Sequence, residues 1–113
     1  MAYRLMPVAR LAWGGLLAGE PGIVLGTLTG AAPARAQTRV LRVLGTRHLL
    51  QGALDLARPT PFVLRCGAAV DLLHAATCAG AVVFLPAWRR VALLDGTGAV
   101  GFAACGLLWA RIT

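Results

Sequence analysis

The sequence predicts an all-α fold, a small transmembrane helix bundle of about four helices in which the second helix is shallow or marginally inserted. Its composition is the first observation: 58% of the 113 residues are hydrophobic and 13% are charged, whereas a soluble domain has about 25% charged residues. The second observation is a pair of apolar segments near the C-terminus, each long enough to cross a bilayer. At this length, residues 1–113 are expected to form a single membrane-embedded helical domain.

The first expected helix covers residues 5–29 and should be kinked or broken. Glu20 and Pro21 interrupt its apolar stretch, and a proline removes a backbone donor and clashes with the preceding turn. A basic start, this apolar run and the sequence Ala34-Arg35-Ala36 also imitate a secretory signal with its cleavage site. Glu20 and Pro21 argue against cleavage, because they would lie in the middle of the signal's hydrophobic region.

The second expected helix, residues 39–57, is the marginal one. Arg47 and Asp55 together cost roughly 5 to 7 kcal/mol near the middle of a membrane, and the eight leucine and valine residues of the segment recover roughly 2.4 to 4.8 kcal/mol. The helix therefore needs neighbours for its polar side, or it lies in the membrane interface.

The third and fourth expected helices cover residues 61–85 and 90–110. Thr60 can cap the third helix, Pro61 can take its first position and Pro86 can end it. About 24 apolar residues from position 62 give roughly 36 Å of helix, enough to cross a hydrocarbon core of about 30 Å. Tryptophan and arginine flank the fourth segment at both ends, at positions 88–90 and 109–111, which is typical of a span anchored at two interfaces.

Arginine positions leave the topology open. If all four helices span, five arginines fall on each side of the membrane (positions 4, 10, 58, 65 and 111 against 35, 39, 42, 89 and 90), so the positive-inside rule does not choose. If residues 39–57 lie in the interface, seven arginines fall on the side of the C-terminus and four on the other side. The C-terminus is then expected in the cytoplasm.

Several classes of function are disfavoured by the composition. The chain contains no serine, which excludes a serine hydrolase mechanism. Its arginines are scattered among apolar runs, so no nucleic-acid surface is expected. Cys66, Cys78 and Cys105 form no CxxC pair, and neither a disulfide framework nor a zinc ribbon is indicated. The composition weighs against an enzyme without deciding the question, and a membrane enzyme stays open as a third class of function.

Polar residues nevertheless recur at helical spacing on three of the expected helices. At 100° per residue, the polar side chains of residues 39–57 form one ridge along the second helix. The third and fourth helices each carry a polar face lined by small residues. This predicts a buried polar seam, whose candidates are Arg47, His48, Gln51, Asp55, Asp71, His74 and Asp95. The expected helix-packing residues are Gly45, Gly52, Gly67 and Gly106.

A metal site is the less favoured interpretation of these polar residues. His48, Asp71, His74 and Cys78 are acceptable ligand types, but there is no HxxxH or HExxH pair, and Arg47 beside the site would repel a cation. We therefore expect no metal and no cofactor. Activation of Cys78 as a nucleophile by His74, four residues away, is a formal alternative, although nothing in the sequence is seen to lower the pKa of its thiol.

Burial of Arg47 requires a partner. Arg47 is interpreted as the basic residue deepest in an expected helix, and Asp71 on the third helix is the preferred partner. Asp55, on the same ridge as Arg47, is the alternative partner.

The stretch RVLGTRHLLQGALD (42–55) followed by AAVDLLHA (68–75) resembles a family of short actinobacterial multi-helix membrane proteins of unknown function. Gly45, Arg47, His48, Gln51, Asp71 and His74 carry the resemblance, which covers about residues 10–105. The layout is more distantly similar to DoxX-type four-helix membrane proteins. The resemblance implies a fold and a membrane location, but no activity.

The sequence therefore favours a multi-pass protein of the cell membrane that acts as a structural or accessory subunit. Its expected partners are the lipid bilayer and either copies of itself or a larger membrane complex. The alternative function is a small carrier or proton-linked membrane protein that uses the arginine, histidine and aspartate side chains of the polar seam.

Overall fold

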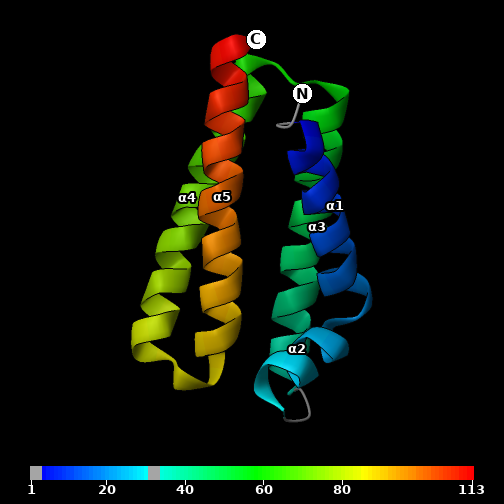
Figure 1. Ribbon diagram of the computed structural model, residues 1–113. Helices are drawn as coiled ribbons and strands as arrows, with labels where there is room; N and C mark the ends of the chain where they lie inside the picture. Colours follow the sequence, from blue (N-terminus) through cyan, green and yellow to red (C-terminus); the bar gives the residue numbers. More distant parts are fainter. Residues whose placement is uncertain (1–3, 31–33) are drawn as a thin grey trace. The chain divides into compact units, whose positions relative to one another are not determined.

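The structure, a computed structural model, describes residues 4–30 and 34–113. These residues form helices joined by short turns, without a strand, which confirms the all-α prediction. The elements in chain order are α1 (Leu5–Gly19), α2 (Pro21–Thr29), α3 (Arg35–Ala57), α4 (Pro61–Phe84), the single 3-10 turn η2 (Pro86–Trp88) and α5 (Arg89–Ile112) (Figure 1).

The chain divides into two compact units, each built around a pair of antiparallel helices. Unit 1 is Met1–Ala57, in which α1 packs along α3, and unit 2 is Arg58–Thr113, in which α4 packs along α5 (Figure 1). In unit 2 the single turn η2 between α4 and α5 explains the antiparallel arrangement, and in unit 1 the helix α2 comes between α1 and α3 in the chain. Each unit therefore has its own buried helix interface.

The first expected helix is broken, as Glu20 and Pro21 predict. Residues Leu5–Gly19 and Pro21–Leu28 meet at an angle of 92°. Glu20 leaves the helical conformation (φ −132°, ψ 53°), and Pro21 begins α2 at a position that needs no backbone donor. Gly30 ends α2 with φ of 69°, a left-handed conformation that glycine adopts without a steric penalty.

Glycine allows the backbones of α1 and α3 to approach closely. A Cβ atom on Gly45 would lie 2.4 Å from the backbone nitrogen of Ala18 and 2.6 Å from the carbonyl oxygen of Gly14. A Cβ on Gly14 would lie 2.8 Å from the Gly45 oxygen, and one on Gly52 would lie 2.9 Å from the side chain of Leu11. The two helices pack through small residues, as membrane helices commonly do.

The ends of the unit 2 helices follow the sequence signals. The backbone N–H of Val63 donates to Oγ1 of Thr60 over 3.2 Å, so Thr60 caps α4, and Pro61 is its first residue. Pro86 follows the last turn of α4, where Arg89 Nε donates to the carbonyl oxygen of Val82 over 2.9 Å. The expected start and stop of this helix are confirmed.

The interface of unit 2 is lined mainly by small side chains. Leu64, Ala68, Asp71 and Cys78 are buried on α4, and the buried residues of α5 include Asp95, Ala99, Ala103, Gly106 and Ala110. A Cβ on Gly96 would lie 2.8 Å from Cβ of Cys78, so this glycine lets α5 approach α4 beside Cys78. Of the two tryptophans expected at membrane interfaces, Trp88 is half-buried and Trp109 is buried.

Two helical segments are long and apolar enough to cross a membrane: Pro61–Phe84 and Pro86–Ile112. The broken α1–α2 pair becomes a third candidate if it is counted as one span. Over the described part of the chain α3 is not among these candidates. Its arginines and buried polar residues account for this, as the marginal position of residues 39–57 predicts.

Replacing Gly45 by alanine should destabilise unit 1, because the new methyl group would meet backbone atoms that cannot rotate away. The expected loss is about 1 to 3 kcal/mol, measured as helix unfolding of the detergent-solubilised protein. Gly15→Ala is the matched control, since a Cβ there has no atom within 4 Å and alanine favours a helix by about 1 kcal/mol. Equal losses for the two variants would contradict close backbone packing.

Candidate functional site

A buried ion pair joins the two long helices of unit 1. Arg10 on α1 and Asp55 on α3 are 1% and 2% exposed, and Nε of Arg10 lies 3.8 Å from Oδ2 of Asp55. Nη2 of Arg10 also lies 3.8 Å from the sulfur of Met6. Opposite charges in contact offset part of the cost of removing each from water.

The polar ridge expected on residues 39–57 lies along the α1-facing side of α3. His48 and Asp55 are buried there, alternating with Leu41, Gly45 and Gly52 at spacings of three and four residues. Arg47 and Gln51 are half-buried at the edge of this face, where Nη1 of Arg47 donates to Oε1 of Gln51 over 3.3 Å. The expected Arg47–Asp71 pair joins residues of different units and stays a prediction.

Three chemically versatile side chains meet in unit 2. Nε2 of His74 is hydrogen-bonded to Oδ2 of Asp95, and Sγ of Cys78 lies 3.5 Å from the same His74 nitrogen. His74 and Cys78 are one helical turn apart on α4, and Asp95 comes from the facing helix α5. One donor atom from each of the three residues lies within 4.8 Å of the others. We call His74, Cys78 and Asp95 the three-donor cluster.

The geometry of the three-donor cluster differs from that of a nucleophile relay. In a relay, the base uses one ring nitrogen for the nucleophile and the other for the orienting carboxylate. Here Cys78 and Asp95 both contact Nε2 of His74, and one nitrogen holds a single proton or a single lone pair. The thiol and the carboxylate therefore meet at the same nitrogen of His74, and the imidazole cannot pass a proton from the thiol to the carboxylate through its two nitrogens.

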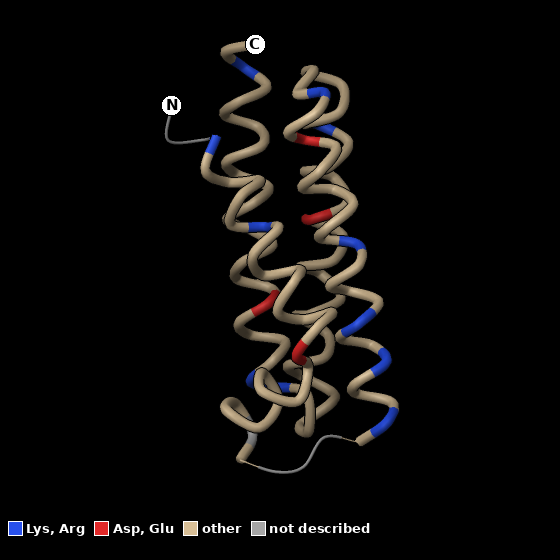
Figure 2. Tube along the Cα trace, turned by 90° about the vertical axis from the view of Figure 1, so that its right-hand side faces the viewer, with Lys and Arg blue, Asp and Glu red and all other residues tan. Residues whose placement is uncertain are grey.

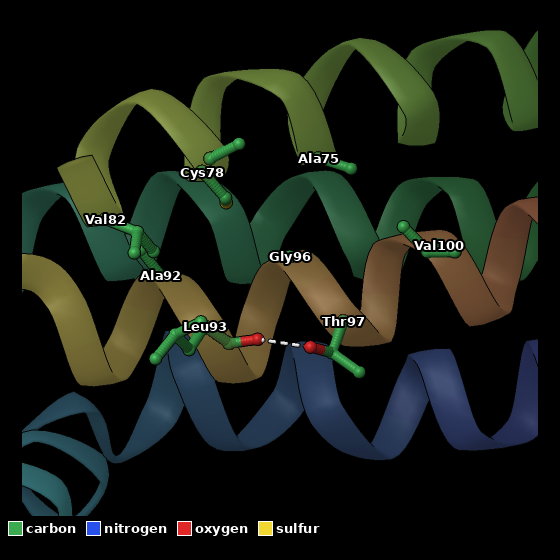
Figure 3. Close-up of a pocket in the computed structure, with 9 residues that line it drawn as sticks. Ala75, Cys78, Val82, Ala92, Leu93, Gly96, Thr97 and Val100 are labelled. Atoms are coloured by element: carbon green, nitrogen blue, oxygen red, sulfur yellow. Dashed lines mark hydrogen bonds between the residues drawn. The ribbon is translucent and has the colours of Figure 1, made fainter.

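A small open cavity adjoins the cluster on the Cys78 side. It has a volume of about 210 Å³ and is lined by residues of α4 and α5 only, among them Ala75, Cys78, Ala92, Gly96 and Thr97 (Figure 3). Thr97 does not offer its hydroxyl proton to this cavity, because Oγ1 donates to the carbonyl oxygen of Leu93 over 2.6 Å. The cavity is apolar apart from the Cys78 sulfur and the Thr97 hydroxyl.

Arginines and aspartates are distributed differently along the helices (Figure 2). Asp55, Asp71 and Asp95 are all buried within helices, whereas nine of the eleven arginines are exposed and only Arg10 and Arg47 are not. The first half of α3 carries three of the exposed arginines, at positions 35, 39 and 42. The polar chemistry of the interior therefore depends on three carboxylates, two histidines and Arg10.

For two of these residues, Arg10 and Asp95, the surroundings predicted from the sequence differ from those in the structure. Arg10 was counted among the flanking arginines, and Asp95 was placed in the polar seam but not beside Cys78. The helical period of α1 carries a signal for Arg10, because it lies three residues from the buried Pro7, four from the buried Gly14 and seven from the buried Leu17. Of the expected packing glycines, Gly45 and Gly52 lie in the α1–α3 interface, Gly106 is buried in α5 and Gly67 is half-buried.

The chain matches no family model, no curated protein and no solved structure. The resemblance to short actinobacterial membrane proteins stays a prediction.

Removing one partner of the Arg10–Asp55 pair should destabilise unit 1, because the other charge would remain buried. Arg10→Met and Asp55→Leu are each expected to cost about 3 to 5 kcal/mol, visible as lower accumulation and a lower unfolding midpoint in detergent. The double variant should regain much of the loss, since two apolar side chains need no charged partner. Arg111→Met, at an exposed position, is the control. Losses that simply add in the double variant would contradict the pair.

Proposed function

We propose that the protein is a multi-pass membrane protein that acts as a structural or accessory subunit, packing against copies of itself or a larger membrane complex. The observation that carries this proposal is the reversal of the usual burial pattern. Asp55, Asp71, Asp95, His48 and Arg10 are among the most buried side chains. A helical protein with ionisable groups inside and bulky apolar groups outside is suited to lipid or to an apolar partner.

The outward faces of the long helices support the same proposal. Large hydrophobic side chains are exposed on each of them, and Leu73 and Phe84 are 71% and 79% exposed. The exposed set further includes Val43, Leu50, Leu54, Phe62, Val83, Leu93, Val100, Leu107 and Leu108. In water this surface would favour aggregation, so a membrane or a membrane-embedded partner is the environment that it fits.

The pairing of polar groups inside each unit favours a structural role over a transport role. Arg10 contacts Asp55 within unit 1, and His74 contacts Asp95 within unit 2. Such contacts fix the register of two helices and satisfy buried charges without requiring a substrate.

A tagged full-length chain should remain in the pellet when membranes are extracted with carbonate. After mild detergent extraction, native mass spectrometry should report an assembly heavier than the 11.7 kDa chain, because the exposed apolar faces are expected to be covered by protein. Recovery in the soluble fraction, or a chain found only as a monomer, would contradict the proposal.

The His74–Asp95 hydrogen bond supports a second candidate, a proton-linked carrier. Histidine changes its charge between about pH 5 and 8, and a carboxylate beside it in an apolar interior can exchange a proton with it. In proteoliposomes, such a carrier would show a proton flux that varies over this pH range and is lost in His74→Ala. A flux that is absent, or that His74→Ala leaves unchanged, would exclude this candidate.

A further inference from the structure

We propose that the three-donor cluster binds a divalent transition-metal ion of the zinc class, with His74 Nε2, Cys78 Sγ and Asp95 Oδ2 as its ligands. This departs from the expectation, drawn from the sequence, that no metal is bound. It goes beyond the accessory role and does not depend on it, because the ligands all lie within unit 2.

The types of donor atom select the class of ion. Thiolate and imidazole together suit zinc and its neighbours, whereas magnesium and calcium take oxygen ligands. Three protein ligands that leave one coordination position open are the pattern of a reactive or exchangeable zinc site, since structural sites use four. The cluster offers such a set from two adjacent helices.

The spacing of Cys78 Sγ and His74 Nε2 fits this assignment. Bonds of about 2.3 Å to sulfur and about 2.0 to 2.1 Å to nitrogen, at a tetrahedral angle, place the two ligand atoms about 3.6 Å apart. The observed separation of Cys78 Sγ and His74 Nε2 is 3.5 Å. The carboxylate of Asp95 is hydrogen-bonded to the same nitrogen. Nitrogen and oxygen ligands of one tetrahedral ion lie about 3.3 Å apart, so this carboxylate would move away from Nε2 when the ion takes the place of the proton that these two atoms share.

Charge balance permits an ion in this environment, because a divalent cation that replaces two protons leaves the net charge of the site unchanged. On binding, the ion replaces the proton shared by His74 and Asp95 and the proton of the Cys78 thiol, and both protons are released to solvent. A divalent cation with one thiolate, one carboxylate and one neutral imidazole carries no net charge. A neutral site is the arrangement that a buried, apolar interface tolerates best.

The cavity beside Cys78 supplies an approach to the open coordination position. Cys78 belongs both to the three-donor cluster and to the lining of the 210 Å³ cavity (Figure 3). Gly96, next to Asp95 in sequence, leaves this side of α5 without a side chain that would cover the sulfur. An ion can therefore reach the cluster from the surface of unit 2.

Cobalt(II) added to the full-length protein in detergent tests the proposal, because a thiolate ligand gives Co²⁺ an intense near-ultraviolet charge-transfer band. We expect that band to saturate at about one ion per chain and Zn²⁺ to abolish it by displacement. Cys78→Ser should eliminate the band, and Asp95→Asn should weaken it. Absence of the band from the unmodified protein, or its persistence in Cys78→Ser, would overturn the proposal.

The other two cysteines provide the matched control. Cys66 is exposed and Cys105 is half-buried, and neither belongs to the cluster, so the double variant Cys66→Ser/Cys105→Ser should keep the full cobalt band. In that background Cys78 is the single thiol, and Zn²⁺ should slow its alkylation. This measurement needs no change to a ligand, so it stands even if Cys78→Ser fails to fold. Alkylation at an unchanged rate with Zn²⁺ would overturn the proposal.

Discussion

Each unit depends on one constraint: a charged side chain inside an apolar helix pair must have its partner on the other helix. In unit 1, Asp55 near the end of α3 lies against Arg10 of α1, and in unit 2, Asp95 of α5 is hydrogen-bonded to His74 of α4. Sliding one helix by a single turn, about 5.4 Å, would separate either pair. The ion pair and the hydrogen bond therefore fix the registers in which the small residues of each interface meet.

Close backbone approach is what makes these contacts short enough to form. Gly14 and Gly45 bring α1 and α3 together in the middle of unit 1, and Gly96 brings α5 against Cys78 in unit 2. In a membrane, dispersion contacts between closely packed helices would replace the hydrophobic effect, which gives little in lipid. Small residues thus serve both stability and the placement of polar groups.

Local signals in the sequence predicted much of the fold. Thr60 and Pro61 begin α4, Pro86 ends it, and Glu20 with Pro21 breaks the first helix, because capping and the missing proline donor act within a few residues. The expected start of the second helix at residue 39 was too late. The helix begins at Arg35, where Oε1 of Gln37 accepts a bond of 3.2 Å from the backbone N–H of Ala34, a capping contact between residues with no obvious start signal.

Periodicity indicated which faces are polar but not which residues meet. His48 and Asp55 are buried on α3, and Leu93, Val100 and Leu107 are exposed on α5, as the helical spacing suggests. The partner of Asp55 and the grouping of Asp95 with His74 and Cys78 depend on the register of two antiparallel helices. That register depends on these polar contacts together with the places where glycines permit close approach, and a single sequence does not reveal them.

The right-angled break between α1 and α2 has a consequence for how a bilayer would fit the molecule. The 15 residues of α1 reach roughly 22 Å, short of a hydrocarbon thickness of about 30 Å, whereas the 24 residues of α4 reach roughly 36 Å. In a bilayer, α1 would be too short and would thin the lipid around it, whereas α4 would be too long and would tilt. The two helices would therefore create hydrophobic mismatch of opposite sign. Lipid chain length would then act in opposite directions on α1 and α4, because thinner membranes would suit the shorter helix and thicker membranes the longer one.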